Sequence, residues 1–212
     1  MPPAAESVAV RLPLRTLLGD YPVTRALRQG ALTSAVTPLD FADVAVPNKA
    51  FKRVVRDLEF DVAELALMTF LMARSRDVPL RLLPVVVFSR NPLPYLVCDR
   101  ARQIPPEGLA GRRIGVRSYT TTTAVWVRAL IADQFGVDFG AVEWVTLEDG
   151  HVAGVADPPS VHRGPTGADL MTLLRDGDID AAIVDPVPAS PRFASVVPDP
   201  EATDHAWQNR HG

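Results

Sequence analysis

The sequence predicts an α/β protein built from two lobes. Strand-like and helix-like patterns alternate along most of the 212 residues. Several predicted strands are apolar throughout, which is typical of a sheet covered on both faces. A break near residues 99–107 separates two runs of such elements and indicates where the lobes would meet.

The first half of the chain carries three strand patterns and three helix patterns. The predicted strands are residues 8–14, residues 36–41 and the long β-branched segment 80–90, which ends at Ser89 and Arg90. A proline in the first turn and Gly30 at the end bound a short helix over 21–30. The next helix, 48–57, has Asn48 as its expected N-cap. Residues 60–76 begin extended and are expected to become helical near Glu64.

The second half repeats the alternation. Residues 112–116 and 142–147 are predicted strands, and a helix over 122–136 lies between them and is closed by Gly136. Residues 149–166, rich in glycine and proline, are expected to form a long loop. A last helix stops at Gly177 and leads into a strand with Asp185 at its carboxyl end.

Composition narrows the class of protein. With 47% hydrophobic and 22% charged residues the chain reads as an ordinary globular protein. Its net charge is −3 and its basic residues are scattered, so neither nucleic acid nor an anionic membrane is an expected partner. The single cysteine, Cys98, excludes an internal disulfide. The N-terminal sequence lacks the basic start and apolar run of a signal peptide, so a cytoplasmic location is expected.

The stretch GVRSYTTTTAVWVRAL, residues 115–130, holds the most specific pattern. A strand that runs into a helix N-terminus presents unbonded backbone N–H groups and the positive end of the helix dipole. Thr120, Thr121, Thr122 and Thr123 would add hydroxyl donors there and complete a carboxylate or phosphate site. The alternative is that one threonine caps the helix and the others are β-branched filler.

Location favours a binding site, because open α/β sheets bind ligands beyond the carboxyl ends of their strands. Four further side chains fall at such ends, namely Ser89, Arg90, Tyr119 and Asp185. The histidines lack the i, i+3 or i, i+4 spacing of a metal site and are expected to be solvated. Neither a glycine-rich phosphate loop nor a nucleophile elbow is present. The sequence therefore predicts no cofactor and no metal.

Five segments together resemble the 4,5-dihydroxyphthalate decarboxylase family. They are DYPVTRALRQG, FDVAELALMTFLMAR, VVVFSR, LAGRRIGVRSYTTTTAVWVRALIADQFGVD and LLRDGDIDAAIVD. The resemblance implies the type 2 periplasmic-binding-protein fold, in which two α/β lobes close around a small ligand. It also implies cofactor-independent decarboxylation of a hydroxylated aromatic acid and a role in aromatic compound catabolism.

This chemistry assigns roles to several residues. It needs a proton for the ring carbon that bears the carboxylate, and cations or N–H dipoles to hold a second carboxylate. Glu64 and Asp185 are the catalytic candidates, although Glu64 could merely cap a helix and Asp185 could cap a turn. Arg90 is the anion clamp or, alternatively, a surface arginine paired with an acid. Tyr119 either contacts an aromatic ligand or packs as a hinge residue.

Two departures from the family pattern stand out. Family members usually carry an arginine and a histidine shortly after the pair that matches Ser89 and Arg90, whereas this chain has Asn91 and Pro92 and no histidine there. Family proteins also continue past the position of Gly212. We therefore expect residues 1–98 to form a first lobe that lacks its C-terminal return segment, residues 99–198 to form the second lobe, and residues 199–212 to begin the return.

Three functions remain open at this point. The chain could be a decarboxylase of hydroxylated aromatic carboxylic acids, a solute-binding protein that captures a small organic anion without chemistry, or an inactive truncated homologue. In each of the first two, the expected partner is a small aromatic or organic carboxylate held between the lobes. An uncovered apolar face on an incomplete first lobe could also drive formation of a homo-oligomer.

Overall fold

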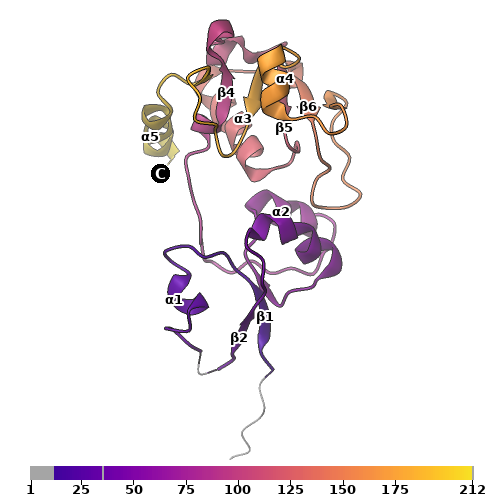
Figure 1. The fold of residues 1–212 in the computed structure, drawn as a ribbon, viewed down its shortest axis with the longest axis vertical. Helices are drawn as coiled ribbons and strands as arrows, with labels where there is room; N and C mark the ends of the chain where they lie inside the picture. Colours follow the sequence, from indigo (N-terminus) through magenta and orange to yellow (C-terminus); the bar gives the residue numbers. More distant parts are fainter. Residues whose placement is uncertain (1–11, 35, 212) are drawn as a thin grey trace, which may run out of the picture.

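The computed structural model describes residues 12–34 and 36–211 and has two lobes, each with its own sheet and helices (Figure 1). The predicted two-lobe α/β class is confirmed. The first lobe carries α1, β1, β2 and α2, and the second carries the elements from β4 to α5. No helix in the described ranges is long and apolar enough to cross a membrane.

The first lobe is built on a small parallel sheet with the order β2-β1-β3. Its strands are β1 (Leu14–Leu17), β2 (Leu39–Phe41) and β3 (Val62–Ala63). Two helices, α1 (Arg25–Arg28) and α2 (Leu67–Arg74), and the helical turns Pro47–Ala50 and Arg53–Asp57 accompany the sheet. Leu17, Phe51, Val54 and Val55 form the centre of this lobe's core.

The second lobe has a six-stranded sheet with the order β7-β6-β5-β8-β4-β9. The strands are β4 (Leu96–Asp99), β5 (Arg113–Val116), β6 (Glu143–Thr146), β7 (Val161–Arg163), β8 (Ala181–Ile183) and β9 (Phe193–Ser195). The helices are α3 (Thr122–Phe135), α4 (Leu170–Asp176) and α5 (Pro200–His211). Strand β4 runs antiparallel to both of its neighbours, β8 and β9.

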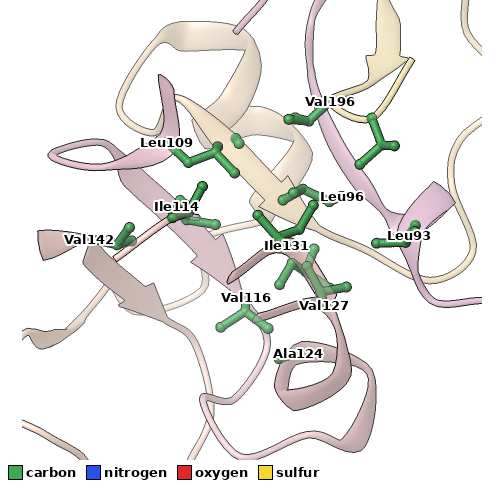
Figure 2. Close-up of a cluster of buried hydrophobic side chains, with 14 of the residues drawn as sticks. Leu93, Leu96, Leu109, Ile114, Val116, Ala124, Val127, Ile131, Val142 and Val196 are labelled. Atoms are coloured by element: carbon green, nitrogen blue, oxygen red, sulfur yellow. The ribbon is translucent and has the colours of Figure 1, made fainter. Parts of the chain in front are cut away.

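Apolar strands of this sheet are covered on both faces, as their composition predicts. One cluster packs Ile114 and Val116 of β5 against Val127 and Ile131 of α3 (Figure 2). The other cluster places Leu174 of α4 with alternate residues of the sheet and the nearby Ile179. Burial of these side chains makes the second lobe the stable frame for α3 and its N-terminus.

Three strands of the second sheet repeat the arrangement of the first sheet. In the first lobe the earliest strand, β1, lies between β2 and β3, and in the second lobe β5 lies between β6 and β8. Each of these pairs is parallel. Their carboxyl ends therefore point to one edge of each sheet, which is where an open α/β sheet offers a ligand site.

The predicted strand over residues 80–90 is wrong. These residues belong to the connecting segment, residues 79–92, which joins the lobes without regular structure. Most of its apolar side chains are exposed, and Val86 reaches 79%. Proline has no N–H to donate to a ladder, and Pro79, Pro84 and Pro92 interrupt the segment. Ser89 and Arg90 therefore do not end a strand.

Other boundaries also moved. Helix α2 begins at Leu67 rather than near Glu64, and Val46 rather than Asn48 takes the N-cap position ahead of Pro47. The predicted loop 149–166 contains β7, which pairs in parallel with β6. The predicted strand 8–14 falls mostly outside the described residues. Strand β4 crosses the expected lobe boundary between residues 98 and 99, and all of its pairing lies in the second sheet.

Candidate functional site

A cleft of about 2490 Å³ lies between the lobes and is lined by residues of both. The first lobe contributes Tyr21 and Glu64, and the second contributes Asp185 together with the start of α3. The connecting segment adds Ser89 and Arg90. Most of the predicted site residues therefore meet at one cavity, although three separate parts of the chain supply them.

The hydroxyls of Thr121, Thr122 and Thr123 accept hydrogen bonds from three different parts of the chain. Thr121 occupies the N-cap of α3, where its side chain accepts a hydrogen bond from the Ala124 N–H at 3.4 Å. Thr122 accepts a hydrogen bond of 3.1 Å from the N–H of Met68, which is the second residue of α2 in the other lobe. Thr123 accepts a hydrogen bond from the guanidinium of Arg90 at 3.4 Å.

The bond from Met68 to Thr122 brings two helix N-termini together. The N-cap residue of α2, Ala66, has no side-chain oxygen, so a threonine of the other lobe does the work of a cap. Each helix end carries partial positive charge from its unpaired N–H groups. The end of α3 contacts Arg90 through Thr123, so this part of the cleft wall is suited to attract an anion.

Arg90 is held by contacts on several sides. Its Nη2 donates to Asp185 Oδ2 at 2.5 Å, and its guanidinium carbon lies 4.3 Å from the centre of the Tyr95 ring. Partial burial lowers the pKa of Arg90, but the hydrogen bond to Asp185 and its charge outweigh this effect and the net pKa is raised. Arg90 therefore stays cationic while it lines the cleft.

Glu64 forms a pair with Tyr21 that sequence reasoning missed. The hydroxyl of Tyr21 donates to Glu64 Oε1 at 2.7 Å, and the N–H of Gly19 donates to Glu64 Oε2 at the same distance. Burial raises the pKa of Tyr21, and the bond to Glu64 raises it further, so the hydroxyl keeps its proton. Tyr21 follows shortly after the carboxyl end of β1, and that position was the signal that could have found it.

Tyr119 and Thr120 do not line this cleft. Tyr119 packs edge-on against Trp144, and the guanidinium carbon of Arg128 sits 4.0 Å from the centre of its ring. Arg128 also donates to the backbone oxygen of Tyr119 at 3.0 Å. A Cβ added to Gly150 would lie 3.0 Å from Thr120 Oγ1, which places Thr120 beside the 150–152 loop. Tyr119 thus belongs to the packing of the second lobe.

His151 lies between the lobes, so the expectation that it is solvated is wrong. Its Nδ1 is 2.9 Å from Thr69 Oγ1 of α2, and its ring meets Phe51 edge-on. Burial lowers its pKa to about 4, assisted by the nearby charges of Arg117, Lys52 and Arg56. The imidazole is therefore neutral near pH 7.

The loop around His151 attaches the second lobe to the first. Arg56 donates to the backbone oxygens of Gly150 and His151 at 3.0 and 2.8 Å. Val152 is buried among Leu17, Phe51 and other residues of the first-lobe core. These contacts and the bond from Met68 to Thr122 join the two lobes. In the described part of the chain no group of three or more histidine, cysteine, aspartate or glutamate residues could hold a metal ion.

Comparison with known proteins confirms the resemblance predicted from the sequence. No protein family model matches the chain. It is 26% identical over 223 residues to a 4,5-dihydroxyphthalate decarboxylase of Comamonas testosteroni, covering 94% of this chain and 64% of that protein. A 4,5-dihydroxyphthalate decarboxylase of Pseudomonas putida is also 26% identical, over 214 residues that make up 93% of this chain and 81% of the relative.

Similar solved structures include holo arginine-binding protein from T. maritima, with 14% identity and a TM-score of 0.34. That match covers 94% of this chain and 74% of the other. An ancestral arginine-binding protein, solved with arginine and with glutamine, matches with 13% identity and a TM-score of 0.35. Each of these matches covers 96% of this chain and 76% of the other.

Proposed function

We propose that the cleft binds a small hydroxylated aromatic carboxylate and removes carbon dioxide from it without a cofactor. The observation that carries the proposal is the placement of Arg90 beside the N-terminus of α3, which itself contacts the N-terminus of α2, with Glu64 and Tyr21 lining the same cleft. The names of the two curated relatives, both 4,5-dihydroxyphthalate decarboxylases, support the choice of reaction.

Each end of the ligand has a matching group. A carboxylate would pair with the planar guanidinium of Arg90 and with the hydroxyl of Thr123. A ring hydroxyl would meet Glu64, which accepts two hydrogen bonds from the protein and still has further acceptor capacity. The cleft thus offers a cation to one end of the ligand and an acceptor to the other.

The proposed reaction uses two proton transfers. Glu64 accepts the proton of the ring hydroxyl, so that the phenolate oxygen releases electron density into the ring. Asp185, having taken a proton from solvent, delivers it to the ring carbon that bears the carboxylate. The bond between this carbon and the carboxylate then breaks, its electron pair returns to the ring and carbon dioxide leaves. Glu64 returns its proton to the oxygen, and one proton is consumed per carbon dioxide released.

A second function, ligand binding without chemistry, is favoured by one observation. Both carboxylates proposed as proton carriers are already engaged, Asp185 by Arg90 at 2.5 Å and Glu64 by Tyr21 and Gly19 at 2.7 Å. A solute-binding protein would need these contacts only to orient Arg90, Glu64 and Tyr21. Catalysis additionally requires Asp185 to exchange Arg90 for a proton when the ligand arrives.

Calorimetric titration with 4,5-dihydroxyphthalate, combined with measurement of carbon dioxide release, tests the proposal. We expect saturable binding that Arg90→Gln weakens by about tenfold or more, because truncating one partner of a charged hydrogen bond costs about 2 kcal/mol or more. Arg112→Gln is the matched control, since Arg112 is exposed and does not line the cleft. Equal affinity in wild type and Arg90→Gln would contradict the site, and binding without gas release would select the second function.

A further inference from the structure

Phe88 projects into the cleft from the connecting segment. It lines the cleft, and 57% of it is exposed. Exposure of a large apolar side chain is unfavourable in water, by about 25 cal/mol for each Å². Phe88 is nevertheless fixed in place, because its ring stacks on Tyr21 with centroids 5.6 Å apart and an interplanar angle of 29°.

The same ring adjoins the anion-binding side of the cleft. The guanidinium carbon of Arg90 lies 5.4 Å from the centre of the Phe88 ring, within the range of a cation–π contact. Tyr21, which stacks on Phe88, links it to Glu64 through its 2.7 Å hydrogen bond. Glu64, Tyr21, Phe88 and Arg90 therefore form a continuous row of contacts.

We propose that Phe88, supported by Tyr21, is the surface on which the ring of an aromatic carboxylate stacks. This inference rests on the proposed function. It makes Phe88 the residue that determines specificity for an aromatic over an aliphatic acid. With its ring on Phe88, a ligand has its carboxylate next to Arg90 and its ring hydroxyl next to Glu64. Offset stacking of this kind is the arrangement that aromatic pairs prefer.

Two dicarboxylates isolate the contribution of the ring. Phthalate and maleate both hold two carboxylates in a cis arrangement, but only phthalate has an aromatic ring. Calorimetry should show that wild type binds phthalate more tightly than maleate. Phe88→Leu should weaken phthalate binding by about tenfold, which is the upper part of the range for an aromatic pair, and should leave maleate binding unchanged.

Two further variants separate stacking from a general effect on the connecting segment. Tyr21→Phe keeps a ring beneath Phe88 and should preserve the ratio of the two affinities, although it removes the hydrogen bond to Glu64. Val86→Ala changes an exposed neighbour on the same segment that also lines the cleft but offers no ring, so it should leave the ratio of the two affinities unchanged.

The possible results distinguish this inference from the function on which it rests. A Phe88→Leu variant that binds phthalate as tightly as wild type overturns the stacking role alone. A Phe88→Leu variant that binds phthalate and maleate more weakly by the same factor also overturns it, because Phe88 would then only support the conformation of the connecting segment. If wild type binds neither phthalate, maleate nor 4,5-dihydroxyphthalate, the proposed function fails and this inference fails with it.

Discussion

Thr122→Val should destabilise the contact between the lobes by removing a cap from a helix of the other lobe. The hydroxyl of Thr122 is the acceptor for the N–H of Met68 at 3.1 Å, and Ala66 at the N-cap of α2 offers no replacement. Loss of an N-cap oxygen costs about 1 kcal/mol, and a partly buried N–H left unpaired raises the cost toward about 2 kcal/mol. Valine has nearly the shape of threonine, so packing should change little.

Chemical denaturation and thermal unfolding measure this loss. For a chain of this size each kcal/mol lowers the melting temperature by about 2–4 °C. Thr122→Ser keeps the hydroxyl and should recover most of the stability. Thr121→Val removes a cap from α3 whose bond, at 3.4 Å, is longer, so its effect should be smaller. The reasoning is refuted if Thr122→Val is as stable as wild type, or if Thr122→Ser loses as much as Thr122→Val.

Two other predictions concern the contact between lobes and the connecting segment. Unfolded His151 takes up a proton near pH 6.5, whereas folded His151 stays neutral down to about pH 4, so its contribution to stability should fall as the pH drops through this window. His151→Gln should flatten that part of the profile of unfolding free energy against pH, and an unchanged slope would contradict the assignment. The exposed Val85 and Val86 should promote self-association. Sedimentation velocity should show concentration-dependent association that Val85→Ser/Val86→Ser reduces, while a wild type that stays monomeric at every concentration would count against it.

The second lobe could be predicted closely because its local signals agree with its tertiary structure. Gly136 and Gly177 end α3 and α4 with φ of +66° and +86°, values that glycine adopts without strain. Strands β5 and β6 fall within one residue of the predicted bounds. Strand β7 was missed because its residues are partly or fully exposed and carry no apolar run. Its pairing with β6 depends on contacts that are distant in sequence.

The connecting segment shows where composition misleads. Residues 80–90 have the β-branched, apolar character of a buried strand, but strand formation also needs a neighbouring strand to pair with. The structure pairs β3 with β1 and gives the connecting segment no place in either sheet. Composition therefore identified a segment able to form a strand, while the strand pairing that would decide the outcome depends on residues distant in sequence.

The sequence predicted several individual residues of the candidate site but not the contacts between them. The end of β8 and the start of α3 led to Asp185 and to three of the four threonines, and these residues line the cleft. Arg90 also lines the cleft, but it was selected from a predicted strand end that the structure does not contain. Tyr119 was predicted to line the cleft, but its side chain packs against Arg128 and Trp144 within the second lobe. The bond between Tyr21 and Glu64 joins residues 43 positions apart, so no local pattern reveals it.

The N-terminus of α3 would link the proposed binding of an anion to the contact between lobes. Thr122 uses its hydroxyl to hold α2 of the first lobe, while the next residue, Thr123, contacts Arg90 in the cleft. A carboxylate bound beside Arg90 would therefore be stabilised by the same helix end that receives α2. Because linkage is reciprocal, a ligand that binds more tightly when the lobes are in contact must strengthen that contact by the same free energy. The threonine run is suited to this coupling, since adjacent side chains on one rigid helix serve the other lobe and the ligand.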